Sequence, residues 1–177
     1  MFSNPDLRRS SGMRHIDTIS QRAGLKKLRM IADFQFGPPG GKAIFPERTR
    51  IEYSAKTGRI RRATYRGRVI ATLIPSTGLL ALTLLGAQRF AKVFPPPRQR
   101  VIVGRDVAEF VAQGKSVFAK HVVNVDPELR PGDEAIVTDV RNRVLAIGKA
   151  LLSPEEMLSF QIGVAVKVRA GSKPRPS

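Results

Sequence analysis

The chain has 177 residues, of which 42% are hydrophobic and 25% charged, a composition typical of a globular protein with one ordinary domain or two small ones. It has neither an apolar run of about 18 residues nor an apolar segment near its start, which argues against a membrane span and a secretion signal. Cysteine is absent and His15 and His121 are the only histidines, which excludes disulfides, thiolate catalysis and Cys- or His-rich metal sites. We therefore expect a cytoplasmic protein with no metal and no cofactor.

Basic residues dominate the charge of the chain. The sequence holds 31 Lys and Arg against 14 Asp and Glu, a formal net charge of +17. The excess is uneven, because residues 1–100 hold 20 basic and five acidic residues, whereas residues 101–177 hold 11 and nine. Polyanions are the natural partners of such a chain, and we expect the first half to supply most of the attraction.

Apolar spacing divides residues 1–97 into an arm, two helices and four strands. Residues 1–14 hold three arginines and little to bury, so we expect a flexible basic arm. Helical spacing predicts a helix over 17–32, and the stretch Gly37–Lys42 predicts a flexible surface loop. A helix over 84–94 ends before three prolines, where we place a domain boundary. The expected strands, where the period is two, cover residues 50–54, 59–65, 68–74 and 79–82.

Residues 98–170 are expected to form short strands with one early helix. That helix is predicted over 106–113 with Gly114 as its C-terminal stop, and a capped helical turn begins at Ser153. The expected strands cover residues 100–103, 116–125, 134–139, 144–150 and 164–168. The predicted fold class is therefore α+β. After the arm comes a small α+β domain with an antiparallel sheet over 15–97, then a mixed β-barrel over 98–170 and a disordered tail over 171–177.

The segment Gly114–Val122 is a candidate binding site. A glycine ends the helix there, and a strand then opens with a lysine, a hydroxyl and an apolar pair. Such a junction turns backbone N–H groups and a cation toward solvent, which suits a phosphate or a nucleotide end. The alternative is a helix stop followed by a strand of the core.

A second candidate site is a run of cations on the predicted hairpin that turns at Arg66-Gly67. Six cations lie within 13 residues, with no acid among them: Lys56, Arg59, Arg61, Arg62, Arg66 and Arg68. Like charges on a hairpin repel one another unless a polyanion compensates them, so we expect contacts to an RNA backbone. The alternative is the solvated face of a thermostable protein.

The remaining chemical motifs predict no catalysis. Gly37–Lys42 departs from the P-loop spacing, and Ala43 stands where a magnesium-binding hydroxyl is needed. His121 is expected to be a packed or rim side chain. Asp33 and Asp133 are expected in turns or caps, and the pair Glu155 and Glu156 caps a helix. We therefore expect a protein that is not an enzyme.

Five segments of the second half occur in the order and spacing of a known family. They are Gly114–Ala119, Asp126–Val137, Ala146–Ala150, Ser153–Met157 and Gly163–Val168. On these segments, residues 98–170 resemble the PUA domain, a small β-barrel RNA-binding module of tRNA- and rRNA-modifying enzymes. The resemblance implies RNA contacts at two opposed segments. Their residues are Gly114, Lys115, Ser116, Val117, Phe118, Ala119 and Lys120 on one, and Gly163, Val164, Ala165 and Lys167 on the other.

The first half narrows the resemblance. Its matching segments are Ala32–Gly37, Gly41–Ala43, Thr57–Arg61, Ala71–Leu73 and Ser76–Leu82. These look like the domain that precedes PUA in archaeal archaeosine tRNA-guanine transglycosylase and its archaeosine synthase relatives. The transglycosylase needs a (β/α)₈ barrel and a Cys-rich zinc site, and the synthase needs cysteine chemistry, neither of which this sequence contains.

The resemblance therefore implies a non-catalytic RNA-binding protein that takes the acceptor stem and 3′ end of tRNA. Two alternatives stay open. One is an accessory RNA-binding subunit of a split transglycosylase-like enzyme, with a separate catalytic chain as its partner. The other is a ribosome-associated or general nucleic-acid-binding protein.

Overall fold

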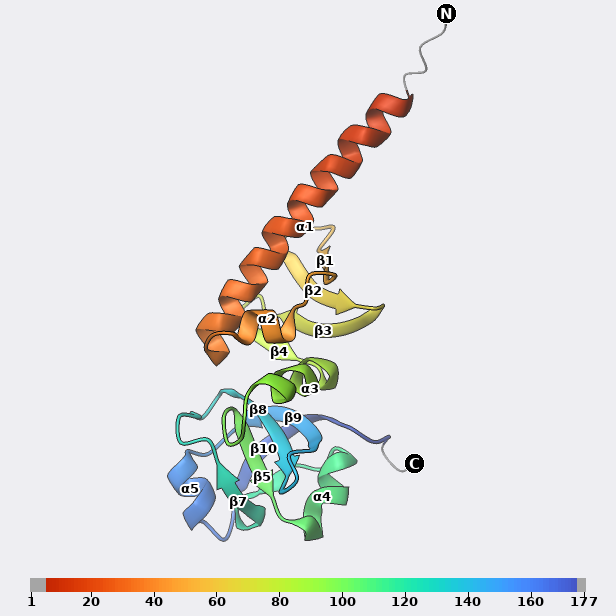
Figure 1. The fold of residues 1–177 in the computed structure, drawn as a ribbon. Coiled ribbons are helices and arrows are strands. Elements are labelled where there is room, and N and C mark those ends of the chain that lie inside the picture. Colours follow the sequence, from red (N-terminus) through yellow and green to blue (C-terminus); the bar gives the residue numbers. More distant parts are fainter. Residues whose placement is uncertain (1–5, 175–177) are drawn as a thin grey trace, which may run out of the picture.

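The computed structural model describes residues 6–174, with side chains from Thr18 onward. Figure 1 shows two parts stacked end to end, with the N-terminal helix projecting from one of them. The elements of the first part are α1 (Asp6–Phe36), α2 (Gly40–Ile44), β1 (Arg50–Tyr53), β2 (Ile60–Tyr65), β3 (Arg68–Leu73), β4 (Leu80–Leu82) and α3 (Leu84–Val93). Those of the second part are β5 (Arg100–Val103), α4 (Arg105–Ala112), β6 (Val117–Phe118), the 3₁₀ turn η1 (Ala119–His121), β7 (Val122–Val125), β8 (Glu134–Asp139), β9 (Val144–Ala150), α5 (Pro154–Ser159) and β10 (Val164–Gly171).

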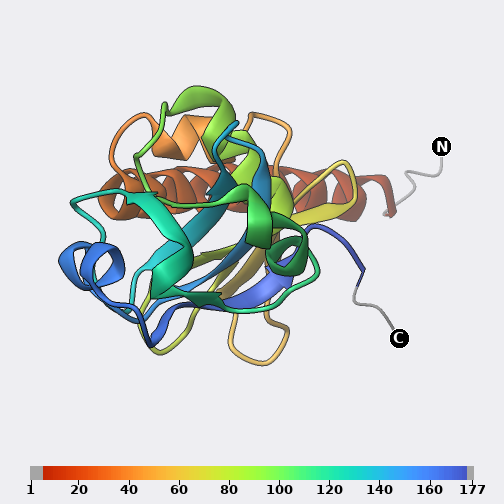
Figure 2. The same cartoon turned by 90° about the horizontal axis from the view of Figure 1, so that it is seen from below.

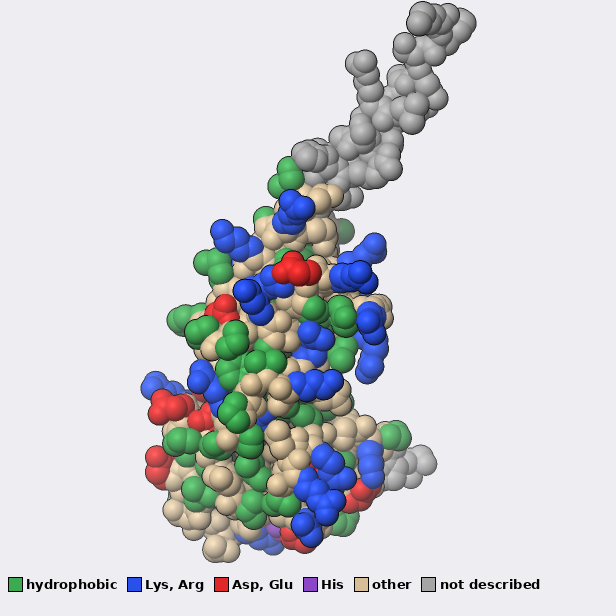
Figure 3. All heavy atoms as spheres, viewed as in Figure 1, with side chains coloured by type: hydrophobic (Ala, Val, Ile, Leu, Met, Phe, Trp, Pro, Cys, Tyr) green, Lys and Arg blue, Asp and Glu red, His purple; other side chains and the backbone are tan. Residues whose placement is uncertain are grey.

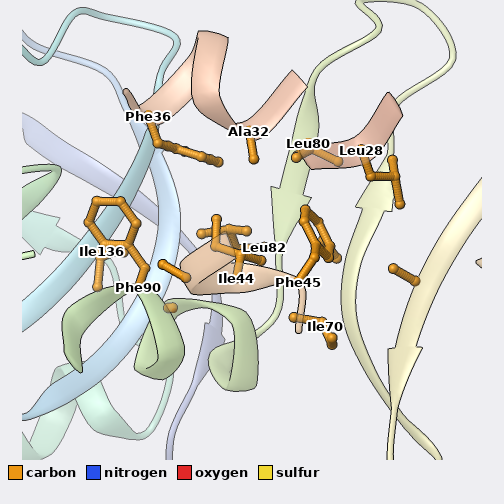
Figure 4. Packing of buried hydrophobic residues seen from close by; sticks show 14 of the residues in the cluster. Leu28, Ala32, Phe36, Ile44, Phe45, Ile70, Leu80, Leu82, Phe90 and Ile136 are labelled. Carbon is orange, nitrogen blue, oxygen red and sulfur yellow. The ribbon is translucent and has the colours of Figure 1, made fainter. Parts of the chain in front are cut away.

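The first part is an antiparallel sheet covered by helices. Its four strands lie in the order β1-β2-β3-β4, and β2 turns into β3 through Arg66 and Gly67, both with positive φ. Apolar side chains of α1 point from one side of the core toward those of α2, α3 and the strands, as Figure 4 shows for Leu28, Ala32 and Phe36. The predicted α+β domain with an antiparallel sheet is therefore confirmed.

Two glutamines of α1 hold the helix to both edges of this sheet. The Gln21 amide donates to the carbonyl of Ile51 and accepts from its N–H, at 2.9 and 2.8 Å. The Gln35 amide does the same with Leu80, at 3.0 and 2.8 Å. Ile51 lies in β1 and Leu80 in β4, the two edge strands, so each amide satisfies backbone groups that an uncovered edge would expose. The helix is thereby fixed across the sheet.

The second part is a six-stranded sheet that curls into a small barrel (Figure 2). Its strands lie in the order β6-β10-β9-β8-β5-β7, with β5 parallel to β8 and the other four neighbouring pairs antiparallel. The short helices α4 and α5 lie on opposite sides of the barrel in Figures 1 and 2. The predicted mixed barrel is confirmed. Within residues 6–174, no helix combines the length and the apolar character that crossing a membrane requires.

The two parts share one hydrophobic core. Phe90 of α3 belongs to the same buried cluster as Ile136 and Ile147 of the barrel, and Figure 4 shows Phe90 beside Ile136. The fully buried Arg100 of β5 donates to the carbonyl of Phe94 at 2.7 Å, which caps the end of α3. The guanidinium also donates to Ala91, Arg98 and Asn142. The parts are therefore joined by packing and by hydrogen bonds.

Two local expectations for the N-terminal half differ from the structure. Helix α1 begins at Asp6 rather than at residue 17, so it takes in most of the expected arm; residues 1–5 lie outside the described residues. The expected loop Gly37–Lys42 runs into helix α2. Gly41 is buried so close to α1 that a Cβ there would lie 2.5 Å from the Arg29 carbonyl oxygen. Asp33 accepts a hydrogen bond from the N–H of Gly41 at 2.7 Å. Glycine here allows two helices to approach closely rather than giving flexibility.

The C-terminal half holds two further differences. The strand expected over 116–125 is divided into β6, η1 and β7. The 3₁₀ turn η1 carries the chain from β6, which pairs with β10, to β7, which pairs with β5. The tail expected to be disordered from residue 171 is ordered through residue 174. Ser172 and Lys173 donate backbone hydrogen bonds to Leu145 and Ala112, at 2.8 and 2.9 Å. Residues 175–177 lie outside the described residues.

Candidate nucleic-acid interface

The predicted junction at Gly114 is a helix stop with a defined geometry. Gly114 adopts φ +90° and donates to the carbonyl of Val111, while Lys115 donates to that of Phe110, at 2.9 and 3.1 Å. These two bonds form a Schellman motif at the end of α4, which requires glycine at the left-handed position. The motif turns the chain into β6 and leaves Lys115 exposed at the corner.

The two predicted halves of the RNA groove lie side by side. Strand β6 pairs antiparallel with β10, with Phe118 opposite Val164 and Val117 opposite Val166. The N–H of Ala119 donates to the carbonyl of Gly163 at 3.0 Å. The segments around residues 114–120 and 163–167, distant in sequence, therefore form one continuous surface.

The side chains of this surface divide by orientation. Val117, Ala119 and Ala165 are buried in the barrel core, so an RNA would meet only their backbone. Phe118 is 47% exposed, and the predicted cations Lys115, Lys120 and Lys167 are exposed. Ser116 and Val164 are half-buried, and Gly163 is exposed with φ +99°.

Three residues near this surface were not predicted from the sequence. Phe160 and Ile162, which lead from α5 to Gly163, are 43% and 82% exposed. Apolar residues next to a helix end ordinarily indicate packing, so only their exposure in the fold reveals a surface role. Lys149 of β9 lies directly opposite Lys167 of β10, and two cations in such a pair repel each other.

The predicted arginine run is split between the two ends of β2. Arg59 and Arg61 lie where the strand begins, whereas Arg66 and Arg68 lie at the hairpin turn after it. Arg62 is different, because its Nε donates to Glu52 on the neighbouring strand at 2.7 Å. Arg66 stacks over Tyr65, with 5.3 Å between the guanidinium carbon and the ring centroid. The run therefore forms two separate groups.

Many other arginines are engaged within the protein. They cap helix ends or pair with carboxylates, so their charge does not lie free at the surface. Arg98 donates to the carbonyl of Phe36 at the end of α1, and Arg89 to that of Ile44 at the end of α2. The same holds for Arg29, Arg62, Arg100, Arg143 and Arg169. The count of 31 Lys and Arg thus overstates the basic side chains that are available to a ligand.

Six cations of the first domain that have no carboxylate partner among the described residues line two hollows. One, of about 800 Å³, lies between α1 and the start of β2 and is lined by Lys27, Arg59 and Arg61. The other, of about 910 Å³, is lined by Arg48, Arg50 and Arg66, together with Glu52. Figure 3 shows Lys and Arg side chains over this domain with few acidic side chains among them.

The titratable groups of the barrel have structural roles. His121 Nδ1 lies 3.5 Å from Asp106 Oδ2, as expected of a rim histidine. Burial alone would raise the pKa of Asp139, but hydrogen bonds from the Arg143 backbone, its guanidinium and the Arg141 backbone lower that pKa overall. In the part of the chain with described side chains, no three His, Asp or Glu residues gather as metal ligands do.

Known protein families match the chain in two consecutive blocks. Residues 26–97 match the patch-forming domain C2 of tRNA-guanine transglycosylase, and residues 99–171 match the PUA domain. The tRNA-guanine(15) transglycosylases of Methanobrevibacter smithii and Thermococcus kodakarensis are each 42% identical to the chain, over 84% and 82% of its length. The chain spans only 23% and 25% of these relatives. The two resemblances expected from the motifs are thus confirmed.

A solved structure supports the fold. A hypothetical protein from the hyperthermophilic archaeon Pyrococcus horikoshii superposes with a TM-score of 0.67 at 20% sequence identity, over 85% of this chain and 91% of that one. A likeness at this identity concerns the arrangement of both domains and not their ligands.

Proposed function

We propose that this chain, which consists of a transglycosylase-type C2 domain followed by a PUA domain, is a non-catalytic RNA-binding protein of the cytoplasm with tRNA as its target. The observation that carries the proposal is the pairing of β6 with β10, which joins both predicted RNA-contacting segments into one exposed surface. The free cations of the C2 domain add a sequence-independent attraction for phosphate.

The PUA surface is proposed to take the acceptor stem and the single-stranded 3′ end. Phe118 offers an exposed ring on which an unpaired base can stack, and Lys115 and Lys120 flank it with positive charge. The exposed Gly163 lets a nucleotide backbone approach closely because it has no side chain. The curated relatives, which are named as tRNA-guanine(15) transglycosylases, support tRNA as the RNA.

The C2 domain is proposed to hold the RNA backbone through Lys56, Arg59, Arg61, Arg66 and Arg68. These side chains have no hydrogen-bonded carboxylate among the described residues, in contrast to Arg62. Their contacts with phosphate release counterions, so they supply affinity that weakens as salt rises. They carry little information about sequence, which leaves selectivity to the PUA surface.

Sequencing of RNA cross-linked to the protein in its native cell tests the proposal. We expect tRNA reads to dominate, with cross-links concentrated near the 3′ end. Competition binding then distinguishes a tRNA-selective protein from a general nucleic-acid-binding protein. If double-stranded DNA or rRNA fragments displace tRNA at equal concentration, the protein is a general binder and the tRNA assignment fails.

A second candidate is an accessory subunit of a split transglycosylase-like enzyme. This candidate rests on the 42% identity of the chain to two tRNA-guanine(15) transglycosylases, and in it a catalytic barrel would act from a partner chain. Affinity purification from the native cell distinguishes the two functions. Co-purification of a barrel-containing chain supports the subunit; recovery of tRNA alone, under conditions that preserve complexes, supports an independent binder.

A further inference from the structure

The cleft of about 800 Å³ beside α1 has walls of two kinds. Its lining includes the cations Lys27, Arg59 and Arg61, and none of the residues lining the cleft is Asp or Glu. The lining also includes apolar groups at or just past the strand ends. These are Ile60, Leu73, Ile74 and Pro75, next to the ring of Tyr53. Small-molecule sites commonly have this size and this mixture of apolar wall and few polar groups.

A bulge in β2 directs one of the cations to this place. Tyr53 of β1 pairs with Ile60 and Glu52 pairs with Arg62, so Arg61 is an extra residue without a partner on β1. Bulges re-aim a side chain out of the regular alternation and are frequent beside binding sites. Arg61 thus reaches the cleft, while its neighbour Arg62 pairs with Glu52.

The position of Tyr53 in the cleft lining depends on a contact that needs glycine. A Cβ on Gly24 of α1 would lie 2.4 Å from the Tyr53 hydroxyl oxygen. Without it, Tyr53 packs against the helix and its hydroxyl donates to the carbonyl of Ser20 at 2.7 Å. The ring is therefore held in one position at the cleft wall.

From these features we infer that the cleft binds one unpaired nucleotide, with its phosphate on Lys27, Arg59 and Arg61 and its base against the apolar wall. Three cations without a counter-charge in a partly apolar hollow favour a multivalent anion. The apolar wall then selects an anion with a flat ring, since a base stacks on an aromatic or guanidinium plane. A duplex would present only its phosphates and leave that wall uncovered.

The cleft continues along α1 into a second hollow of about 510 Å³. The two share Ala23, Lys27 and Gly78, and the second is lined by Met30 and Phe34, which are 63% and 84% exposed. A neighbouring base in a single strand would meet Phe34 there. The inference rests on the proposed RNA binding for the strand, and a free mononucleotide is the other source of the same chemistry.

A bulky substitution in the cleft tests the inference without changing its charge. Ala23→Trp places a large ring at the wall, and Ile19→Trp, which adds the same ring to an exposed position of α1 outside the cleft, is the matched control. The binding probes are a blunt RNA hairpin and the same hairpin with one bulged nucleotide. Thermal unfolding of both variants verifies that they fold.

We expect the full-length wild type to prefer the bulged hairpin, and Ala23→Trp to lose that preference by roughly tenfold, as when one stacked base is lost. Ile19→Trp should keep it. If wild type and Ala23→Trp show the same preference, the cleft does not hold an unpaired nucleotide of RNA, while RNA binding stands; the cleft assignment as a whole is overturned if free mononucleotides also fail to bind. If the wild type binds neither hairpin nor tRNA, the proposed function itself fails.

Titration with guanosine and adenosine 5′-monophosphate tests whether the cleft binds a free mononucleotide rather than a nucleotide of an RNA strand. Saturable NMR shifts at Lys27, Arg61 and Gly78 that are absent in Ala23→Trp support the site. Together with an unchanged hairpin preference, they assign it to a free mononucleotide. Equal shifts with inorganic phosphate alone would show a simple anion site and overturn the nucleotide assignment.

Discussion

The Arg169 guanidinium of β10 donates a hydrogen bond of 2.7 Å to the backbone carbonyl of Leu82 in β4, 87 positions earlier in the chain. Glu134 of β8 accepts from the N–H of Leu82 at 3.0 Å and also forms a salt bridge with Arg169. An ion pair of the barrel thus completes the backbone pairing of the last strand of the C2 sheet. Together with the shared core, this contact joins the C2 sheet to the barrel.

Replacing Arg169 with methionine should destabilise the whole protein. The change leaves the buried Glu134 carboxylate without its cation and the Leu82 carbonyl without a donor, a loss of about 3 kcal/mol in the free energy of unfolding. Urea denaturation measures it. The double variant Glu134→Gln with Arg169→Met should recover part of the loss, because no charge remains buried. Equal stability of wild type and Arg169→Met would contradict this account of the domain contact.

Arg61→Ala should reduce the slope of log K against log salt for tRNA by about one, since one phosphate contact is lost. The charge-conserving double variant Glu52→Gln with Arg62→Gln is the control. In the wild type the Arg62 guanidinium is paired with the Glu52 carboxylate, so we expect the double variant to leave the slope unchanged. Filter binding at a series of salt concentrations measures both. Identical slopes for Arg61→Ala and wild type would remove Arg61 from the interface.

Arg100→Met should lower stability without altering the salt dependence of RNA binding. The side chain is fully buried and donates to carbonyls at the end of α3, so its loss leaves several acceptors unsatisfied, at about 2–4 kcal/mol. Burial lowers the pKa of Arg100, and the nearby Asp126 opposes that shift. Denaturation and binding are measured on the same sample. A reduced salt slope would mean that this buried charge also contributes to RNA binding.

Asp139→Asn should destabilise the barrel in a pH-dependent manner. The folded state lowers the pKa of Asp139 through its bonds to Arg143 and Arg141, so its stabilisation is present above the unfolded pKa near 4 and is lost as the pH falls below it. We expect a loss of about 1–3 kcal/mol at pH 7 that shrinks at pH 3. Denaturation at both pH values measures the difference. A deficit that stays constant between them would exclude the charge as its cause.

Much of the fold is predictable from sequence because its signals are local. Alternating strands around Arg66-Gly67 and the helix stop at Gly114 depend on turn chemistry that a few residues specify. The buried role of Gly41, by contrast, depends on contact with Arg29, a residue of another helix. Packing between distant segments overrides local preference there.

The candidate site likewise has features that the sequence predicts and features that only the folded structure shows. The resemblance to the PUA domain implies that the segments of β6 and β10 meet, but which arginines are free does not follow from a run of cations. Arg62 is paired because β1 places Glu52 beside it, and Arg61 is directed to a cleft because a bulge interrupts the register. Similarly, the exposure of Phe160 and Ile162 is a property of the folded surface.

The affinity of the protein for intact tRNA, compared with the same tRNA lacking its single-stranded 3′ end, tests the central claim most directly. We predict that the wild type prefers intact tRNA by about tenfold or more, the effect of one stacked base, and that Phe118→Ala narrows this ratio while the salt slope persists. Equal affinity of the wild type for the two tRNAs would contradict the assignment of the PUA surface to the 3′ end.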